Sequence, residues 1–70
     1  MERLFVSSSN LYSVGYNSDA AVLEIEFRNG GLYQYYHVPA HVYHGLMQAD
    51  SHGRYFIRFI QNRFRYRRIR

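Results

Sequence analysis

The sequence of 70 residues contains no cysteine, no tryptophan and no lysine, and it has a single proline. Without cysteine the chain cannot form a disulfide or a thiolate metal site, which excludes the disulfide-rich secreted class. No apolar run approaches the roughly 20 residues of a membrane span, and residues 1–7 are too short and polar for a signal peptide. We therefore expect one soluble, cytoplasmic domain over residues 1–70.

Acidic residues are absent from the last twenty positions, and this segment holds seven arginines. The first fifty residues carry two arginines and five acidic residues. Their formal charge is therefore −3 and that of the last twenty residues is +7, which gives a net charge of +4. A concentrated patch of one sign attracts polyanions, whereas evenly spread charge mainly maintains solubility. Arginine suits forked hydrogen bonds to phosphate, although the codon usage of a GC-rich genome would also replace lysine with arginine.

Alternation of apolar and polar residues predicts three strands in the first part of the chain. Residues 21–28 alternate most clearly, with Ala21, Leu23, Ile25 and Phe27 on one face. Residues 11–16 alternate weakly. Residues 32–38 follow Asn29-Gly30-Gly31, a hairpin turn whose glycines can adopt positive φ.

Two helices are expected next. Pro39 suits the first position of a helix, and residues 42–49 carry apolar side chains at helical spacing. Ser51 is a good N-cap for a second short helix that ends near Gln61. The residues of this second helix that we expect to face the core are Phe56, Phe59 and Ile60.

Residues 64–67 alternate again and predict a last strand. The predicted order is therefore βββααβ. We expect an α+β fold in which a small antiparallel β-sheet carries two short helices on one face.

Several short segments, in their order and spacing, resemble the KTSC domain family over about Val6 to Ile69. They are Ser8-Ser9-Asn10-Leu11, Val14-Gly15-Tyr16, Phe27-Arg28-Asn29-Gly30, Tyr33-Gln34-Tyr35, Val38-Pro39 and residues 49–56. In that family the segment occurs at the C-terminus of some lysyl-tRNA synthetases and alone in short bacterial and phage proteins. The resemblance implies a single KTSC-like domain of unknown function, with RNA binding suggested and a tRNA-like ligand as one form of it.

Tyr33 and Tyr35 are two residues apart on a strand, so both rings face the same side of the sheet. If Asn29-Gly30-Gly31 forms a three-residue loop, Phe27 lies opposite Tyr33 and Ile25 lies opposite Tyr35. Both tyrosines then join the apolar core.

If Gly30-Gly31 alone forms the loop, Arg28 and Glu26 lie opposite the two tyrosines, whose rings are then free to stack a base. A slip of one residue moves every side chain to the other face. We favour the core alternative because it leaves one consistent apolar face. It places Leu32, Gln34 and Tyr36 outside.

The arginines of the last strand alternate with aromatic residues and would form a basic stripe on one face, made by Arg63, Arg65 and Arg67. Arg54 and Arg58 are one helical turn apart and would extend this stripe. Guanidinium groups match phosphate oxygens, and aromatic rings stack bases. The predicted nucleic-acid-binding residues are Arg54, Arg58, Arg63, Arg65, Arg67, Arg68, Tyr36 and Tyr66.

Other site chemistry has weaker support in the sequence. His37, His41 and His44 are close in the chain, but imidazoles from a strand end and a helix rarely converge on a metal without supporting ligands. The adjacent pair Ser51-His52 seldom reaches catalytic geometry, and Ser51 is expected to cap a helix. We expect no enzyme activity, no metal or other cofactor, and no small-molecule substrate.

The leading hypothesis is a small basic module that binds RNA, tRNA-like or otherwise, or another polyanion through the arginine-rich C-terminal strand. Alternatively, these arginines pair with Glu24 and Glu26 on a neighbouring face. A further hypothesis is a module for protein–protein interaction or homodimer formation, because eight tyrosines and five phenylalanines exceed what a small core can bury. We expect no membrane partner, since alternating arginine and aromatic residues indicate a strand and not an amphipathic helix.

Overall fold

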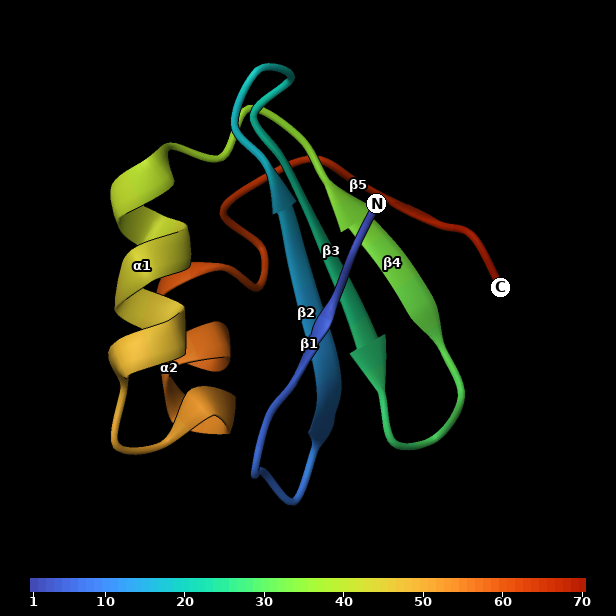
Figure 1. The fold of residues 1–70 in the computed structure, drawn as a ribbon, viewed down its shortest axis with the longest axis vertical. Coiled ribbons are helices and arrows are strands. Elements are labelled where there is room, and N and C mark those ends of the chain that lie inside the picture. Colours follow the sequence, from blue (N-terminus) through green and yellow to red (C-terminus); the bar gives the residue numbers. More distant parts are fainter.

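A computed structural model of the protein describes residues 1–70 and contains five strands and two helices. Strands that follow one another in the chain are neighbours in a single antiparallel sheet of order β1-β2-β3-β4-β5 (Figure 1). The elements are β1 (Leu4–Phe5), β2 (Leu11–Asn17), β3 (Val22–Phe27), β4 (Leu32–Tyr35), α1 (Ala40–Gln48), α2 (His52–Phe59) and β5 (Tyr66–Arg68). The predicted α+β fold is confirmed, and the two-residue β1 is an addition to it.

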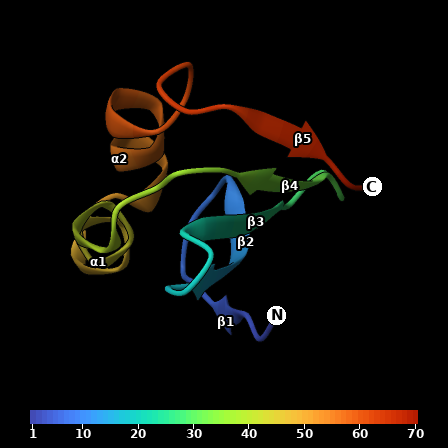
Figure 2. The same cartoon turned by 90° about the horizontal axis from the view of Figure 1, so that it is seen from above.

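Both helices pack on one face of the sheet, as predicted, and Figure 2 shows α1 and α2 together on one side of the strands. The core lies between the two layers. Neither helix has the length and apolar character needed to span a membrane. The core residues are Leu11, Val14, Leu23, Ile25, Tyr35, Val38, Val42, Leu46, Phe56 and Ile60.

Several element ends differ from the sequence prediction. Strand β4 ends at Tyr35 and not at residue 38, because His37 has a φ of 58° and turns the chain away from the sheet. Pro39 then serves as the N-cap of α1, one residue before the predicted position. Strand β5 begins at Tyr66, two residues later than predicted, because the turn that follows α2 occupies the preceding residues.

The weak alternation of residues 11–16 reflects a bulge in β2. Leu11 lies opposite Phe27 and Ser13 opposite Glu26, so Tyr12 is an extra residue between them. The bulge moves Leu11 onto the same face as Val14, where both are fully buried. A regular strand would have placed Leu11 on the opposite face from Val14.

The turn between β3 and β4 sets the register of this hairpin. The Phe27 N–H donates to the Gly31 carbonyl at 2.8 Å, and the Gly30 N–H donates to the Phe27 carbonyl at 2.9 Å. The loop therefore consists of residues 28–30, and Gly30 has the positive φ of 96° that such loops favour at their last position. The loop has the predicted length of three residues but begins one residue earlier than predicted.

This earlier start shifts the pairing by two residues and keeps every side chain on its predicted face. Tyr33 lies opposite Ile25 and Tyr35 opposite Leu23, where the sequence had suggested Phe27 and Ile25. Both tyrosines face the helices, so the core alternative is confirmed in its choice of face and wrong in its exact pairs.

The helices follow their sequence signals with one exception. Val42 and Leu46 of α1 are buried, and the Ser51 hydroxyl accepts a hydrogen bond from the Arg54 N–H at 3.2 Å, which is the predicted cap. Phe59 was predicted to face the core but is 45% exposed. It packs on the surface, with its ring 4.7 Å from the ring of Tyr55.

The sheet face away from the helices is held by ion pairs. The Arg3 guanidinium bonds Glu24 at 2.5 Å and Ser13 at 2.8 Å, and Arg70 bonds Glu26 at 2.9 Å. Ser13 and Glu24 are almost fully buried beneath these contacts. Leu32, predicted to lie outside, is on this face and is also buried, because the C-terminal residues pair with its backbone.

Glu24 is charged in a largely covered position. Burial by itself would raise the pKa of Glu24, but hydrogen bonds from Gln34 and Arg3 and the positive charge of Arg3 outweigh it. The pKa of Glu24 therefore lies below its usual value of 4.5. A lowered folded-state pKa contributes stability above the unfolded-state pKa, and this contribution is lost as the pH falls through the folded-state pKa.

We expect Glu24→Gln to lower the free energy of unfolding at pH 7 by about 1–3 kcal/mol, because the ionised acceptor of Arg3 is lost. As the pH falls below 4.5 and through the lowered folded-state pKa of Glu24, the difference should shrink. Urea unfolding at pH 7, 5 and 3 measures both effects. Asp19→Asn is the matched control because Asp19 is exposed and its side chain has no ion pair. A pH-independent difference between wild type and Glu24→Gln would contradict this account.

We expect Gly15→Ala to destabilise the protein by about 1–3 kcal/mol. A Cβ at Gly15 would lie 2.6 Å from the Glu2 backbone oxygen, so the segment that carries Arg3 would have to move. Gly53→Ala is the control, since a Cβ there has no neighbour nearer than 3.9 Å and alanine favours the α2 helix. Thermal unfolding should show a lower Tm for Gly15→Ala and an equal or higher one for Gly53→Ala. The reverse order would refute the close approach at Gly15.

Candidate nucleic-acid interface

Four aromatic side chains from three elements form a cluster at the β5 edge of the sheet. Tyr33 and Tyr35 on β4 have ring centroids 6.4 Å apart, and the ring of Tyr66 on β5 lies 5.8 Å from each of them. Phe56 on α2 packs edge-on against Tyr35 at 5.7 Å. Tyr66 belongs to this cluster because it lies opposite Tyr35 in the β4–β5 ladder, and opposite residues of antiparallel strands share a face.

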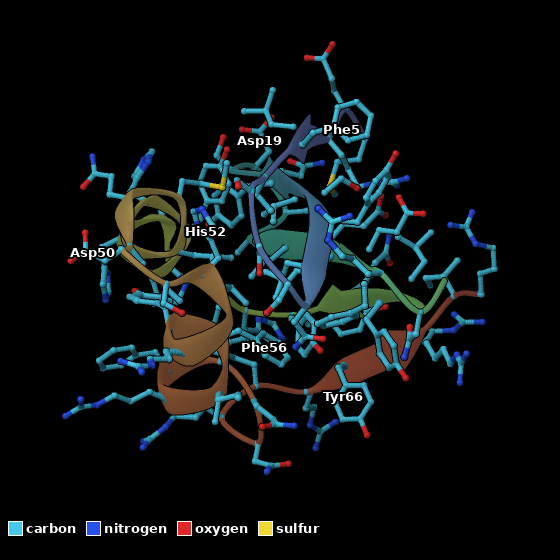
Figure 3. All side chains as sticks on the ribbon, turned by 90° about the horizontal axis from the view of Figure 1, so that it is seen from below. Phe5, Asp19, Asp50, His52, Phe56 and Tyr66 are labelled. Carbon is cyan, nitrogen blue, oxygen red and sulfur yellow. The ribbon has the colours of Figure 1, made fainter.

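Within this cluster, the exposed fraction of the tyrosine side chains increases from the core to the edge of the sheet. Tyr35 is 5% exposed, Tyr33 is half-buried and Tyr66 is 58% exposed. Burial, reinforced by the neighbouring Tyr33 and Tyr66, raises the pKa of Tyr35, so its hydroxyl stays protonated at neutral pH. Figure 3 shows Phe56 between α2 and the sheet and Tyr66 projecting from β5. The cluster therefore holds the exposed ring of Tyr66 against buried core residues.

A hollow of about 260 Å³ is lined by the rings of this cluster and by amide side chains. It forms where the tip of the β3–β4 hairpin and the segment before β2 approach the turn after α2. Its lining residues are Asn10, Phe27, Asn29, Tyr33, Tyr35, Phe56, Gln61, Asn62 and Tyr66. We call this hollow the tyrosine pocket.

The turn after α2 brings two of these amides to the rim. The N–H groups of Ile60 and Gln61 both donate to the Phe56 carbonyl, at 2.9 Å and 2.8 Å, and close the helix. Asn62 then has a φ of 62°, a left-handed conformation that asparagine adopts more readily than most residues. The chain reverses there and runs back to β5.

The predicted arginines do not form a single stripe. Arg63 lies in the turn before β5, and its Nε donates to the Arg58 carbonyl at 3.1 Å. Arg67 lies opposite Gln34 and so belongs to the face away from the helices, and alternation along the chain directs Arg65 the same way. Arg68 lies opposite Tyr33, on the face of the tyrosine pocket, with its guanidinium 5.7 Å from that ring.

The two predicted stacking tyrosines lie on opposite faces of the sheet. Tyr66 is on the helix side, whereas Tyr36 is on the other side, where its hydroxyl donates to the Gln34 side chain at 3.2 Å. Tyr36 is also partly buried. Of the two rings, Tyr66 is the better stacking surface.

Most arginines of the C-terminal segment have no carboxylate partner. The ion pairs of the protein join Arg3 to Glu24 and Glu26, and Arg70 to Glu26. The alternative in which the C-terminal arginines pair with these two glutamates therefore applies to Arg70 alone. The arginines of this segment left without an ion pair are Arg54, Arg58, Arg63, Arg65, Arg67 and Arg68, and all are exposed.

The histidines of the chain do not gather with acidic residues. His37 lies in the turn before α1, His41 and His44 are exposed on α1, and no three histidine or acidic side chains come close enough together to hold a metal ion. His52 Nδ1 lies 2.7 Å from the Leu46 carbonyl and links α2 to α1.

Two groups of apolar side chains remain on the surface. Phe5 is 74% exposed on β1, where its ring packs edge-on against Tyr12 at 5.1 Å. Ile57 and Phe59 on α2 are 59% and 45% exposed. The sequence expectation that the aromatic content exceeds the core is in keeping with these positions.

Sequence reasoning missed the amides of the tyrosine pocket. Asn10, Asn29 and Asn62 occupy a bend or turn, where asparagine is common for backbone reasons alone. Their convergence depends on a sheet register and a helix length that the sequence leaves open. The one usable signal was Asn62, since an asparagine just after a predicted helix suggests a left-handed reversal.

Comparison with known proteins places these features in a family. The family model for the KTSC domain matches residues 7–64. A crystal structure of a KTSC domain protein from Yersinia pestis superimposes with a TM-score of 0.96 at 43% identity, covering 99% of this chain and 97% of that one.

Two kinds of protein are similar in sequence to this chain. An uncharacterized protein of Stutzerimonas stutzeri (strain A1501) is 44% identical over 70 residues and 99% of both chains. A lysine–tRNA ligase of Trichormus variabilis is 39% identical over 54 residues, which is 77% of this chain and 10% of the ligase. From the family match and these relatives, the chain belongs to the KTSC domain family.

Proposed function

We propose that this protein binds RNA through the side of the molecule that carries α2, the following turn and β5. The observation that carries this proposal is the set of six exposed arginines without carboxylate partners, from Arg54 to Arg68, which lie on α2, on the following turn and on the C-terminal segment that includes β5. In both Figure 2 and Figure 3, α2 and β5 lie along the same side of the molecule. An unneutralised cluster of this kind attracts phosphate backbones.

The relatives add support to an RNA ligand. A segment similar to this chain is part of lysine–tRNA ligases of Trichormus variabilis and of Nostoc, proteins whose name includes tRNA. We extend this to the present chain as part of the proposal, with RNA, tRNA-like or single-stranded, as the ligand and the cytoplasm as the compartment. Binding alone is proposed, without a chemical reaction, a metal or another cofactor.

A second candidate function is self-association or binding of a protein partner. The exposed contact of Phe5, on the edge strand β1, with Tyr12, on β2, favours it, because an edge strand with apolar side chains can pair with another chain. Size-exclusion chromatography at two protein concentrations and two salt concentrations separates the candidates. A concentration-dependent dimer that ignores RNA would favour this second function.

We expect Arg65→Ala combined with Arg67→Ala to weaken RNA binding irrespective of RNA sequence. Each lost phosphate contact lowers the slope of log K against log salt by about 0.7 for a single strand, so the double variant should lose about 1.4. Fluorescence anisotropy with a labelled oligonucleotide at four salt concentrations measures this slope.

The double variant Arg54→Ala with Arg58→Ala is the matched control, because it removes the same charge from α2. A larger loss for the Arg65 and Arg67 pair would locate the phosphate contacts at β5 and the residue before it, and equal losses would indicate that α2 contributes phosphate contacts to the same degree. Unchanged affinity and slope in the Arg65→Ala and Arg67→Ala double variant would exclude these two residues from the interface.

A further inference from the structure

We propose that the tyrosine pocket binds one unstacked nucleobase of a single-stranded RNA, an inference that rests on the RNA-binding function proposed above. The pocket differs from its surroundings in charge. Its lining contains no arginine, histidine, aspartate or glutamate, although the protein carries a net charge of +4. The part of a ligand that enters it should therefore be uncharged, while the charged part stays outside among the arginines.

The size and shape of the pocket suit a planar ring system. Its volume of about 260 Å³ is below the roughly 300–1,000 Å³ of pockets that enclose drug-sized molecules. The rings of Tyr33 and Tyr66 are tilted by 50° to each other, and that of Tyr66 is the more exposed. A flat aromatic ligand can stack on Tyr66, and the buried Tyr35 and Phe56 fix the floor of the pocket.

The rim supplies polar groups that the protein does not use itself. The side chains of Asn10, Gln61 and Asn62 form no hydrogen bond within the protein, whereas the Asn29 side-chain oxygen accepts one from the Gly31 N–H at 2.9 Å. Each amide offers donors and an acceptor, which are the groups that read the Watson–Crick edge of a base. An aromatic floor with a rim of free amides therefore fits a nucleobase better than a purely apolar ring.

Arginines stand where the sugar–phosphate backbone would leave the pocket. Arg63 follows Asn62 in the rim turn, and Arg68 lies over Tyr33. A base in the pocket would thus place its own phosphate near guanidinium groups. A base paired within a duplex cannot enter such a pocket, so the ligand is a single-stranded segment, a loop or a bulge.

The test compares two oligonucleotides of equal charge, a short single-stranded RNA and the same strand with its bases replaced by abasic sites. Affinity for each is measured by fluorescence anisotropy across a range of salt concentrations. We expect the strand with bases to bind about 5- to 150-fold more tightly, which corresponds to one stacked base. The two strands should share the same salt slope, because they make the same phosphate contacts.

The variant Tyr66→Ala should remove most of the difference between the two strands and leave the salt slope unchanged. Tyr66→Phe should keep the difference, since the Tyr66 ring is retained. Tyr12→Ala is the matched control, because Tyr12 is 39% exposed and lies outside the pocket. Asn62→Gly keeps the left-handed turn, removes an amide, and should reduce the preference among the four bases. Thermal unfolding of each variant verifies the fold.

Each outcome bears on a different part of the proposal. Equal affinity of wild type for the two strands, with a steep salt slope, would overturn the pocket and leave the phosphate-binding function standing. Equal losses in Tyr66→Ala and Tyr12→Ala would also overturn the pocket. No binding of either strand at low salt would overturn both the RNA-binding function and the pocket.

Discussion

The register of the β3–β4 hairpin is the constraint on which the candidate site depends. The three-residue loop 28–30 places Tyr33 and Tyr35 on the helix side, opposite Ile25 and Leu23. A slip of one residue would exchange them with their polar neighbours. The tyrosines would then meet the face of Glu24, and the helix side would lose the ring of Tyr35 from its core. The positive φ of Gly30 thus has consequences far from the turn itself.

Because side chains alternate along each strand, the two faces of the sheet are stabilised by different interactions. On the helix side, aromatic and aliphatic side chains exclude water, while on the other side Glu24 and Glu26 collect Arg3 and Arg70. Glu24 and Glu26 are two of the five acidic residues of the chain. Because they are engaged there, they do not neutralise the arginines of α2 and β5. The charge separation visible along the sequence therefore persists in three dimensions.

Sequence reasoning succeeded where a local rule decides the structure. The alternation of residues 21–28, the Asn29-Gly30-Gly31 segment and the Ser51 cap each depend on a few neighbouring residues, and the structure confirms them within small shifts. The bulge at Tyr12 and the late start of β5 depend on partners distant in the sequence. The late start leaves Arg63 in the preceding turn, and alternation along β5 places Arg67 and Arg68 on opposite faces. The tyrosine pocket combines four separate segments, so no single motif could indicate it.

Strand β5 is the least secured wall of the pocket. All three of its residues are exposed, and it is attached to the sheet through β4 alone. Segments with few buried contacts open locally at a smaller free-energy cost than global unfolding. Detachment of β5 would dissolve the pocket while leaving most of the core between α1, α2 and the other strands in place. A ligand that contacts both β5 and the turn after α2 would stabilise β5 against local opening. Its binding would be observed as slower amide hydrogen exchange along this edge of the sheet.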